Sequence, residues 1–430
     1  MTRPLSIALA GLGTVGGGVL KLLRDNADIV AARAGRPLAV TAVSARDRTR
    51  DRGVPLAGLR WYDDPVALAS DPQVDVVVEL IGGADGPARA LVEAAIGAKK
   101  PVVTANKAMI ALHGAELAAR AERAGVTLAF EAAVAGGIPV IKALREGLAA
   151  NRILRIAGIL NGTCNYILTV MRERGREFSE VLAEAQKLGY AEADPAFDID
   201  GVDTAHKLAI LASLAFGGPV PFASVHVEGI RAVSALDIAY AGELGYRIKL
   251  LGIARRTERG IEARVHPCMV PEGAPIAGVD GVFNAVVAEG DFVGKMMLEG
   301  RGAGAGPTAS AVVADLIDIA RGRATPVWGA ASDALSNAPA VPMSAHVGAY
   351  YLRLMVVDRP GVIADVTAVL RDLGVSLESM LQRGRSPGEA VPVVLVTHET
   401  EEAAMRAALE RIGALDAVLE QPALIRIEPA

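Results

Sequence analysis

Short apolar runs alternate with longer amphipathic stretches over the first third of the chain. Runs of Val, Ile, Leu and Ala without polar interruption are typical of strands that are buried on both faces of a parallel sheet. We expect such strands at residues 5–10, 39–43, 74–80, 101–104 and 126–130, and helices at 15–26, 87–98 and 114–124. The alternation predicts an α/β domain with a doubly wound parallel sheet over residues 1–135.

The order of elements changes further along the chain. Over residues 136–325, helical patterns come first (138–149, 163–174, 179–188 and 201–216) and strand-like runs follow (246–255, 262–270 and 281–289). This order predicts an α+β domain with helices packed on a largely antiparallel sheet. Residues 326–345 carry Pro326, Pro339 and Pro342 among small polar residues, which indicates a linker.

The last part of the chain, residues 346–430, returns to regular patterns. Strands are expected at 350–357, 375–381, 391–397 and 423–427, and helices at 361–373 and 401–412. The resulting order is strand, helix, strand, strand, helix, strand. It predicts a ferredoxin-like βαββαβ module.

Composition narrows the possible classes of function. Lys and Arg number 44 against 49 Asp and Glu, and a net charge of -5 is too mild to make nucleic acid or a membrane surface the main partner. The 2 cysteines exclude a disulfide scaffold, and no Cys/His cluster suggests zinc. No apolar run approaches the roughly 18 residues of a membrane helix. The opening residues also lack a secretion signal, so we expect a cytoplasmic protein.

A glycine motif follows the first strand directly. Gly11-Leu12-Gly13-Thr14-Val15-Gly16 stands between that strand and a helix. In this setting the G-x-G-x-x-G pattern indicates a Rossmann-type dinucleotide site, and we take its six residues, Gly11, Leu12, Gly13, Thr14, Val15 and Gly16, as cofactor contacts. The free N–H groups at the start of the helix would face the phosphates.

The end of the second strand bears on which dinucleotide binds. NAD sites usually place a carboxylate there for the ribose 2′-hydroxyl, whereas this chain has Ser44, Arg46 and Arg48. A guanidinium suits a 2′-phosphate, so NADP is favoured over NAD with Arg46 as the contact. The neighbouring Asp47 leaves NAD open, and Arg46 as a solvated loop charge is the alternative.

The most unusual segment is residues 188–207, where five carboxylates lie within twelve residues before a helix. On that helix Asp203 and Lys207 are four residues apart and share a face. A solvated acidic loop with an ordinary ion pair is one interpretation. The other is catalytic, because hydride transfer to a carbonyl needs a general acid, and a lysine beside carboxylates fits that role.

At this point the sequence resembles a known family. Residues 185–207 are similar to the signature of homoserine dehydrogenases, with these residues in register: Gly189, Glu192, Asp194, Pro195, Asp198, Gly201, Asp203 and Lys207. The likeness continues in Thr104-Ala105-Asn106-Lys107, in residues 131–139 and in residues 161–168. It implies a monofunctional enzyme that interconverts L-aspartate 4-semialdehyde and L-homoserine with NAD(P), on the route to threonine, methionine and isoleucine.

The resemblance also implies roles for single residues. Lys207 takes the acid/base position, and Lys107 takes the second catalytic position, where it contacts both cofactor and substrate or assists proton transfer. Glu192 and Asp198 match substrate-binding carboxylates, and Asp203 joins them beside Lys207. A surface lysine that ends a strand is the competing interpretation of Lys107.

Two further segments carry implied ligand contacts. Family members bind a monovalent cation such as Na+ in the segment 131–139, which implies Glu131, Val134, Gly136 and Ile138 as its ligands here; a plain hinge between domains is the alternative. The glycine turn of residues 302–306 precedes another helix and implies Gly306 as a cofactor contact, against a mobile loop.

The third domain points to regulation. Its strand-to-helix turn, residues 358–366, resembles that of ACT domains, which bind amino acids, and implies an effector site with Gly361 and Gln382. We expect L-threonine as the effector, with a pure dimerisation module as the alternative, and a homo-oligomer whose second domain is catalytic, substrate-binding and dimerising. Deletion of residues 346–430 is expected to leave catalysis intact. An NAD(P)- and amino-acid-binding sensor without catalysis is the alternative function.

Overall fold

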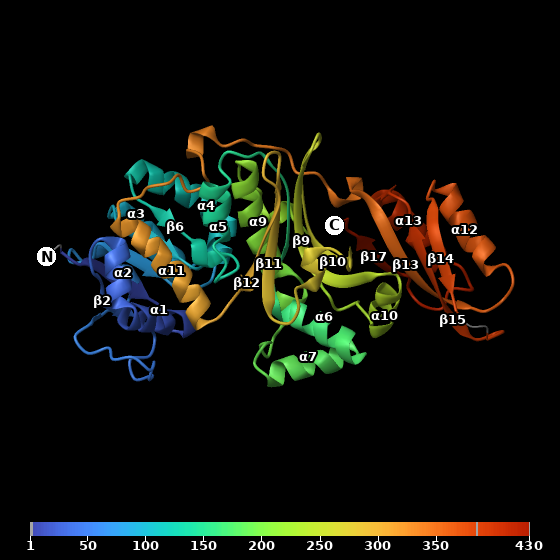
Figure 1. Ribbon diagram of the computed structural model, residues 1–430, viewed down its shortest axis with the longest axis horizontal. Helices are drawn as coiled ribbons and strands as arrows, with labels where there is room; N and C mark the ends of the chain where they lie inside the picture. Colours follow the sequence, from blue (N-terminus) through green and yellow to red (C-terminus); the bar gives the residue numbers. More distant parts are fainter. Residues whose placement is uncertain (1–2, 384–385, 430) are drawn as a thin grey trace.

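The computed structural model describes residues 3–383 and 386–429 and arranges them as three α/β units in chain order (Figure 1). The first unit contains a parallel six-stranded sheet with the strand order β3-β2-β1-β4-β5-β6. Its strands are β1 (Leu5–Ala10), β2 (Leu38–Ser44), β3 (Arg60–Trp61), β4 (Val76–Glu79), β5 (Val102–Thr104) and β6 (Leu128–Ala129). This order confirms the doubly wound sheet.

Helices cover the sheet of the first unit and differ in part from the expected ones. They are α1 (Thr14–Asp25), α2 (Ala27–Ala34), α3 (Pro87–Gly97) and α4 (Lys107–Ala124). The expected helix at 114–124 in fact starts at Lys107, because the Asn106 side chain caps it by accepting a hydrogen bond from the Met109 N–H at 3.1 Å. Lys107 therefore stands in the first turn of a helix at the carboxyl edge of the sheet.

One helix from far along the chain returns to the first unit. α11 (Ala305–Ala320) packs on α1, and the close approach leaves no room for a Cβ at Gly18 beside the Ala305 backbone. Its apolar residues Ala309, Val312 and Leu316 belong to the same buried cluster as Leu9 of β1. The division into residues 1–135, 136–325, 326–345 and 346–430 stays a prediction, and this helix joins the first two parts.

The second unit contains an antiparallel sheet ordered β12-β11-β7-β9-β10. These strands are β7 (Ile153–Ile159), β9 (Tyr246–Thr257), β10 (Gly260–Pro271), β11 (Phe283–Gly290) and β12 (Gly294–Arg301). The helices are α5 (Val140–Lys142), α6 (Gly162–Arg174), α7 (Phe178–Lys187), α8 (Ala196–Ile199), α9 (Val202–Phe216) and α10 (Ala235–Glu243). The α+β prediction is confirmed, although β7 and β12 were not expected.

The third unit has the expected ferredoxin-like order. Its main elements are β13 (Val347–Val357), α12 (Val362–Asp372), β14 (Leu377–Gln382), β15 (Ala390–Thr397), α13 (Glu402–Gly413) and β17 (Ala423–Ile427). β17 pairs in parallel with β10 through Cys268↔Arg426 and Met269↔Ile427. The sheets of the second and third units are therefore one continuous sheet, and β17 lies beside β10 in Figure 1.

Short elements complete the chain. They are β8 (His226–Val227), β16 (Thr400–Glu401), a π-helical turn at Ala143–Gly147 and 3-10 turns at Pro65–Ser70, Glu131–Ala133, Phe222–Ser224, Pro275–Gly278, Ser332–Ala334 and Met343–Ala345. The segment expected as a linker is held in place, because Trp328 is buried against Phe130 and the Ile261 N–H donates to the Pro339 carbonyl. In the part of the chain that the structure describes, no helix combines the length and the apolar character of a membrane span.

Candidate active site

Two lysines from different units share one buried carboxylate. Lys107 Nζ, at the start of α4, lies 2.7 Å from Asp203 Oδ1, and Lys207 Nζ, on α9, lies 2.7 Å from Asp203 Oδ2. Lys207 Nζ also donates to the Leu160 carbonyl at the end of β7, at 2.6 Å. The structure thus brings together three of the residues expected at the site, and we call them the lysine–aspartate triad.

The protonation properties of the triad follow from its burial. Burial alone would raise the pKa of Asp203, but the adjacent Lys207 and Lys107 ammonium groups outweigh this effect and hold the pKa well below its usual value. Burial lowers the pKa of Lys207, and repulsion from Lys107 adds to that effect against the attraction of Asp203. Lys207 is therefore a stronger acid than a free lysine, beside a carboxylate that stays ionised.

Asp198 stands next to the triad on the short helix α8. Its Oδ1 accepts a hydrogen bond from Asn161 Nδ2 at 2.8 Å, and its Oδ2 accepts one from the Thr163 hydroxyl at 3.2 Å. The same Asn161 Nδ2 donates to Asp203 Oδ2 at 2.8 Å. Asn161 also caps α6 through the Cys164 N–H. One asparagine therefore fixes both carboxylates, a role that the sequence motif did not reveal.

These residues line a cavity of about 420 Å³. Its wall comes from four places in the chain: the start of α4, the turn between β7 and α6, the segment from Gly189 to Lys207, and the stretch from β11 to the loop after β12. Asn284 on β11 is buried in this wall, and its Nδ2 has no hydrogen-bond partner within the described residues. A buried amide without a partner marks a place where a bound ligand can supply one.

Two expected site residues lie outside this wall. Glu192 is exposed in the loop before α8 and does not line the cavity, so its substrate contact stays a prediction. Gly306 lies in the first turn of α11, with open space where a Cβ would be, while the preceding Gly302, Ala303 and Gly304 line the cavity. The glycine turn of residues 302–306 therefore does reach the cavity, through Gly302, Ala303 and Gly304 rather than through Gly306.

The amino-terminal glycine turn is built for a dinucleotide. Gly11 has φ +95°, and a Cβ there would overlap the Leu80 carbonyl of the strand beside it. A Cβ at Gly16 would clash with the Gly11 carbonyl, whereas the space over Gly13 is open. Gly13 caps α1 with its backbone in an extended conformation. This geometry leaves the start of α1 accessible to a pyrophosphate, as the motif predicts.

Arginines surround the end of β2, where the adenosine ribose of a dinucleotide lies in such folds. Arg52 Nε donates to the Leu12 carbonyl of the glycine turn at 3.2 Å, and its guanidinium lies 5.5 Å from the centre of the Trp61 ring. The Asp47 carboxylate accepts a hydrogen bond from the Thr49 N–H at 2.8 Å and so stabilises the turn in which it lies. Arg46 has no side-chain partner in the described part of the chain. Arg52 was missed because it lies beyond the strand end that the motif covers.

The segment 131–138 contains backbone carbonyl oxygens that are not used in helix or sheet hydrogen bonds of the residues that the structure describes. Ala135 and Gly136 have φ of 53° and 41°, and within the described residues the carbonyls of Val134 and Gly136 accept no hydrogen bond. Glu131 is buried, and its two carboxylate oxygens accept the Ile141 and Lys142 N–H groups at 3.0 and 2.8 Å. Burial and the neighbouring Asp315 raise the pKa of Glu131 to about 7. The Ile138 carbonyl accepts from the Val140 N–H, so the free oxygens are those of Val134 and Gly136.

Two residues that could compete for a catalytic role are built into the packing instead. Cys164 is fully buried, and burial raises its thiol pKa, which disfavours a nucleophilic thiolate. His206 lies between the rings of Phe197 and Phe222, and burial lowers its pKa. Neither residue lines the 420 Å³ cavity.

The expected effector residues lie in the third unit. Gly361, with φ +95°, caps α12, and Gln382 ends β14, an edge strand of the shared sheet. The structure gives them the positions in the turn and at the strand end that the sequence predicted.

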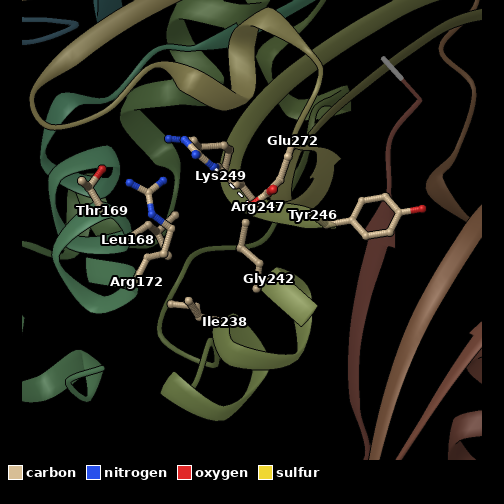
Figure 2. Close-up of a pocket in the computed structure, with 10 residues that line it drawn as sticks. Leu168, Thr169, Arg172, Ile238, Gly242, Tyr246, Arg247, Lys249 and Glu272 are labelled. Atoms are coloured by element: carbon tan, nitrogen blue, oxygen red, sulfur yellow. Dashed lines mark ion pairs between the residues drawn. The ribbon is translucent and has the colours of Figure 1, made fainter. Parts of the chain in front are cut away.

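A smaller cavity of about 110 Å³ lies between α6, α10 and β9, apart from the triad (Figure 2). Its cationic side chains Arg172 and Lys249 lie 2.9 and 3.0 Å from the Asp280 carboxylate. Burial of Asp280 is outweighed by these hydrogen bonds, which lower its pKa to about 2. Tyr246 points away from the cavity in Figure 2. We assign these charges to the packing of α6 on β9.

Comparison with known proteins places each unit in a described family. Residues 139–317 match the family described as homoserine dehydrogenase, residues 11–131 its NAD binding domain, and residues 350–415 the ACT domain. A homoserine dehydrogenase of Pseudomonas aeruginosa is 50% identical over 435 residues, and one of Neisseria gonorrhoeae is 48% identical over 432. Each comparison covers 99% of both chains.

Solved structures agree with this result. A homoserine dehydrogenase from Thiobacillus denitrificans has a TM-score of 0.94 at 50% identity and covers 99% of both chains. A hyperthermophilic archaeal homoserine dehydrogenase in complex with NADPH has a TM-score of 0.65 at 26% identity, and covers 75% of this chain and 100% of its own.

Proposed function

The chain belongs to the homoserine dehydrogenase family, and we propose that it interconverts L-aspartate 4-semialdehyde and L-homoserine reversibly, with NADP as the preferred cofactor. Family membership makes the chain an NAD(P)-dependent oxidoreductase, so the prediction of an enzyme is confirmed and the sensor alternative is set aside. The observation that carries the proposed chemistry is the buried lysine–aspartate triad in the wall of the cavity.

Lys207 is the proposed proton donor and acceptor. In the reducing direction its ammonium gives a proton to the aldehyde oxygen as that oxygen gains negative charge; in the oxidising direction its neutral amine takes the proton of the homoserine hydroxyl. A pKa lowered by burial makes this exchange easier near neutral pH. Lys107 is partly exposed and pairs with Asp203, which supports a proposed role in returning the proton from solvent.

The substrate is an α-amino acid, so its ammonium group needs an acceptor. Asp198 is the proposed acceptor, because its carboxylate is already oriented by Asn161 and Thr163 in the cavity wall. Asp203 is occupied by the two lysines and acts mainly on their charge. Glu192 would complete the ammonium site if the loop before α8 moves toward the cavity.

The cofactor site follows from the glycine turn. Gly11, Gly13 and Gly16 shape the turn, and the start of α1 with Leu12, Thr14 and Val15 would hold the pyrophosphate. Arg46 and Arg52 would hold a 2′-phosphate, which favours NADP. When bound, the nicotinamide supplies or accepts the hydride. Lys107 and residues 302–304 line the same cavity, which supports contacts with the nicotinamide ring there.

A monovalent cation such as Na+ is proposed at the segment 131–138. The free carbonyl oxygens of Val134 and Gly136 have the chemistry that a hard monovalent cation binds. Glu131 would add charge, with Ile138 closing the turn. The cation would fix the junction between the first two units.

We also propose a cellular role. The enzyme would act in the cytoplasm, as a homo-oligomer, on the route to threonine, methionine and isoleucine. The ACT domain would bind L-threonine near Gly361 and Gln382 and reduce activity. Titration with L-threonine tests this directly: wild type should be inhibited, and Gln382→Ala should need more threonine for the same inhibition.

A steady-state assay tests the main proposal. The purified chain should oxidise L-homoserine with NADP+, visible as NADPH absorbance, and Lys207→Met should lower kcat by about 10²- to 10⁴-fold with NADPH affinity retained. Lys21→Met is a matched control, because Lys21 is exposed on α1 and, among the described residues, pairs with Asp25 alone. Near-normal kcat in Lys207→Met would remove Lys207 from the mechanism, and no turnover by wild type would refute the function.

A further inference from the structure

The ACT domain forms ion pairs and hydrogen bonds with both ends of one segment of the second unit. This segment, residues 228–237, precedes and enters α10, and Figure 1 shows α10 beside the third unit. At its start, Glu228 Oε2 lies 2.7 Å from Arg426 Nη1 on β17. At its end, Asp237 accepts from Arg353 Nε at 2.7 Å and from the Tyr351 hydroxyl at 3.1 Å, both on β13. Asp237 and Arg426 are buried, so these are interior contacts.

The middle of the 228–237 segment is attached to α8. The Ile230 N–H donates to the Ile199 carbonyl at 2.9 Å, and Arg231 Nη2 donates to Asp200 Oδ2 at 3.0 Å. Gly229 lies so close to α8 that an added Cβ would overlap the Ile199 carbonyl and lie 2.5 Å from Asp200 Cα. The segment therefore packs directly against α8, which is a single turn of helix.

α8 also carries Asp198, the carboxylate that we propose binds the ammonium group of the substrate. Asp198 lies one residue before Ile199, and its side chain reaches Asn161 and Thr163 in the cavity wall. The path from the ACT domain to the substrate thus has three links: the ion pairs of Glu228 and Asp237, the backbone hydrogen bond of Ile230, and the short helix α8 itself.

We propose that the 228–237 segment is a positioning element by which the ACT domain sets the place of Asp198, with Gly229, Arg231 and Arg353 as positioning residues. The inference rests on the proposed function, since it concerns the affinity of that site for its substrate. A displacement of a binding group by about 1 Å is enough to cost a large factor in rate or affinity.

This arrangement changes the expectation for deletion of residues 346–430. Removal of the ACT domain would leave the buried carboxylate of Asp237 without Arg353 and Tyr351 and would uncover the β10 edge at Cys268 and Met269. The truncated chain should lose stability and substrate affinity together. Full-length variants are therefore the better test.

The first experiment uses Gly229→Ala in the full-length chain. The methyl group must push the segment off α8, so KM for L-homoserine should rise by about tenfold or more with KM for NADP+ within about twofold. Gly242→Ala is the matched control, because Gly242 lies in α10 with nothing within 4 Å of an added Cβ. Circular dichroism and gel filtration establish that each variant folds like wild type.

The second experiment changes Arg353 of the ACT domain, and it tests the proposal even if Gly229→Ala does not fold. Arg353→Gln should raise KM for L-homoserine several-fold, and Arg353→Lys should restore part of the loss. Arg371→Gln, at an exposed pair on α12, should change nothing. Folded variants with wild-type KM for L-homoserine, or with equal losses for both substrates, would overturn the proposal. An inactive wild type would instead refute the proposed function.

Discussion

Replacement of Asp203 by asparagine is the most informative change in the triad. The variant keeps the shape of the side chain but leaves the buried Lys207 ammonium group and the partly exposed Lys107 ammonium group next to a neutral amide. Two unit charges 2.7 Å apart interact by about 6 kcal/mol at an effective dielectric constant of about 20. That value is an upper bound on the loss of stability, because a lysine that is left without a carboxylate partner can become neutral by releasing its proton.

The free energy needed to deprotonate a lysine therefore limits the loss of stability. Release of a proton from a lysine of ordinary pKa at pH 7 costs about 4.6 kcal/mol. Measured losses on breaking a buried ion pair are about 3–5 kcal/mol, in agreement with this limit. We therefore expect Asp203→Asn to lose about 3–5 kcal/mol of stability at neutral pH. Chemical unfolding followed by circular dichroism measures it, with the exposed Asp28→Asn as the control.

The sign of the pH dependence follows from the lowered pKa of Asp203. As pH falls, the unfolded chain takes up the proton first, so the contribution of this carboxylate is complete above about pH 4 and is lost below it. The difference between wild type and Asp203→Asn should therefore shrink in acid.

Catalysis should respond as well. Loss of the carboxylate lowers the pKa of Lys207 further, so the pH at which reduction of the semialdehyde declines should move downward. Unchanged unfolding together with an unmoved pH profile would refute the account of the triad.

Two further predictions address the neighbouring positions. Lys107→Met removes a like charge from Lys207, so the pH profile for reduction should move upward, opposite to Asp203→Asn; a downward shift in the initial-rate profile would contradict the assignment. Arg52→Gln removes a guanidinium near the glycine turn, so KM for NADPH should rise by about tenfold while KM for NADH stays within about twofold; equal changes for both cofactors would argue against a 2′-phosphate contact.

Local patterns were sufficient to predict the parallel sheet of the first unit and the order of elements in the third unit. The buried parallel strands read as unbroken apolar runs, and the glycine turn stands at a fixed place between strand and helix. The βαββαβ order was equally legible, because its strands and helices are short and well separated by turns. These features depend on residues that are neighbours in sequence.

The features that escaped prediction depend on distant contacts. β12 is an edge strand with exposed Gly294 and Lys295, so it lacks the apolar pattern of a buried strand. α11 has an apolar face, but nothing in that face specifies α1 as its partner. The same reason hid the pairing of β17 with β10 and the double role of Asn161. The family resemblance pointed to Lys107 and Lys207, yet it did not indicate that both lysines bind one carboxylate.

The division of the triad between two units has a consequence for the chemistry. Lys107 comes from the parallel sheet, whereas Asp203 and Lys207 come from α9 of the second unit. If the first unit moved away, Lys207 would keep its carboxylate but lose the nearby like charge, and its pKa would rise. The acidity of the proposed proton donor therefore depends on the contact between the first unit and the second unit. Such an arrangement makes proton transfer easiest when both halves of the site are in place, which is the geometry that hydride transfer also requires.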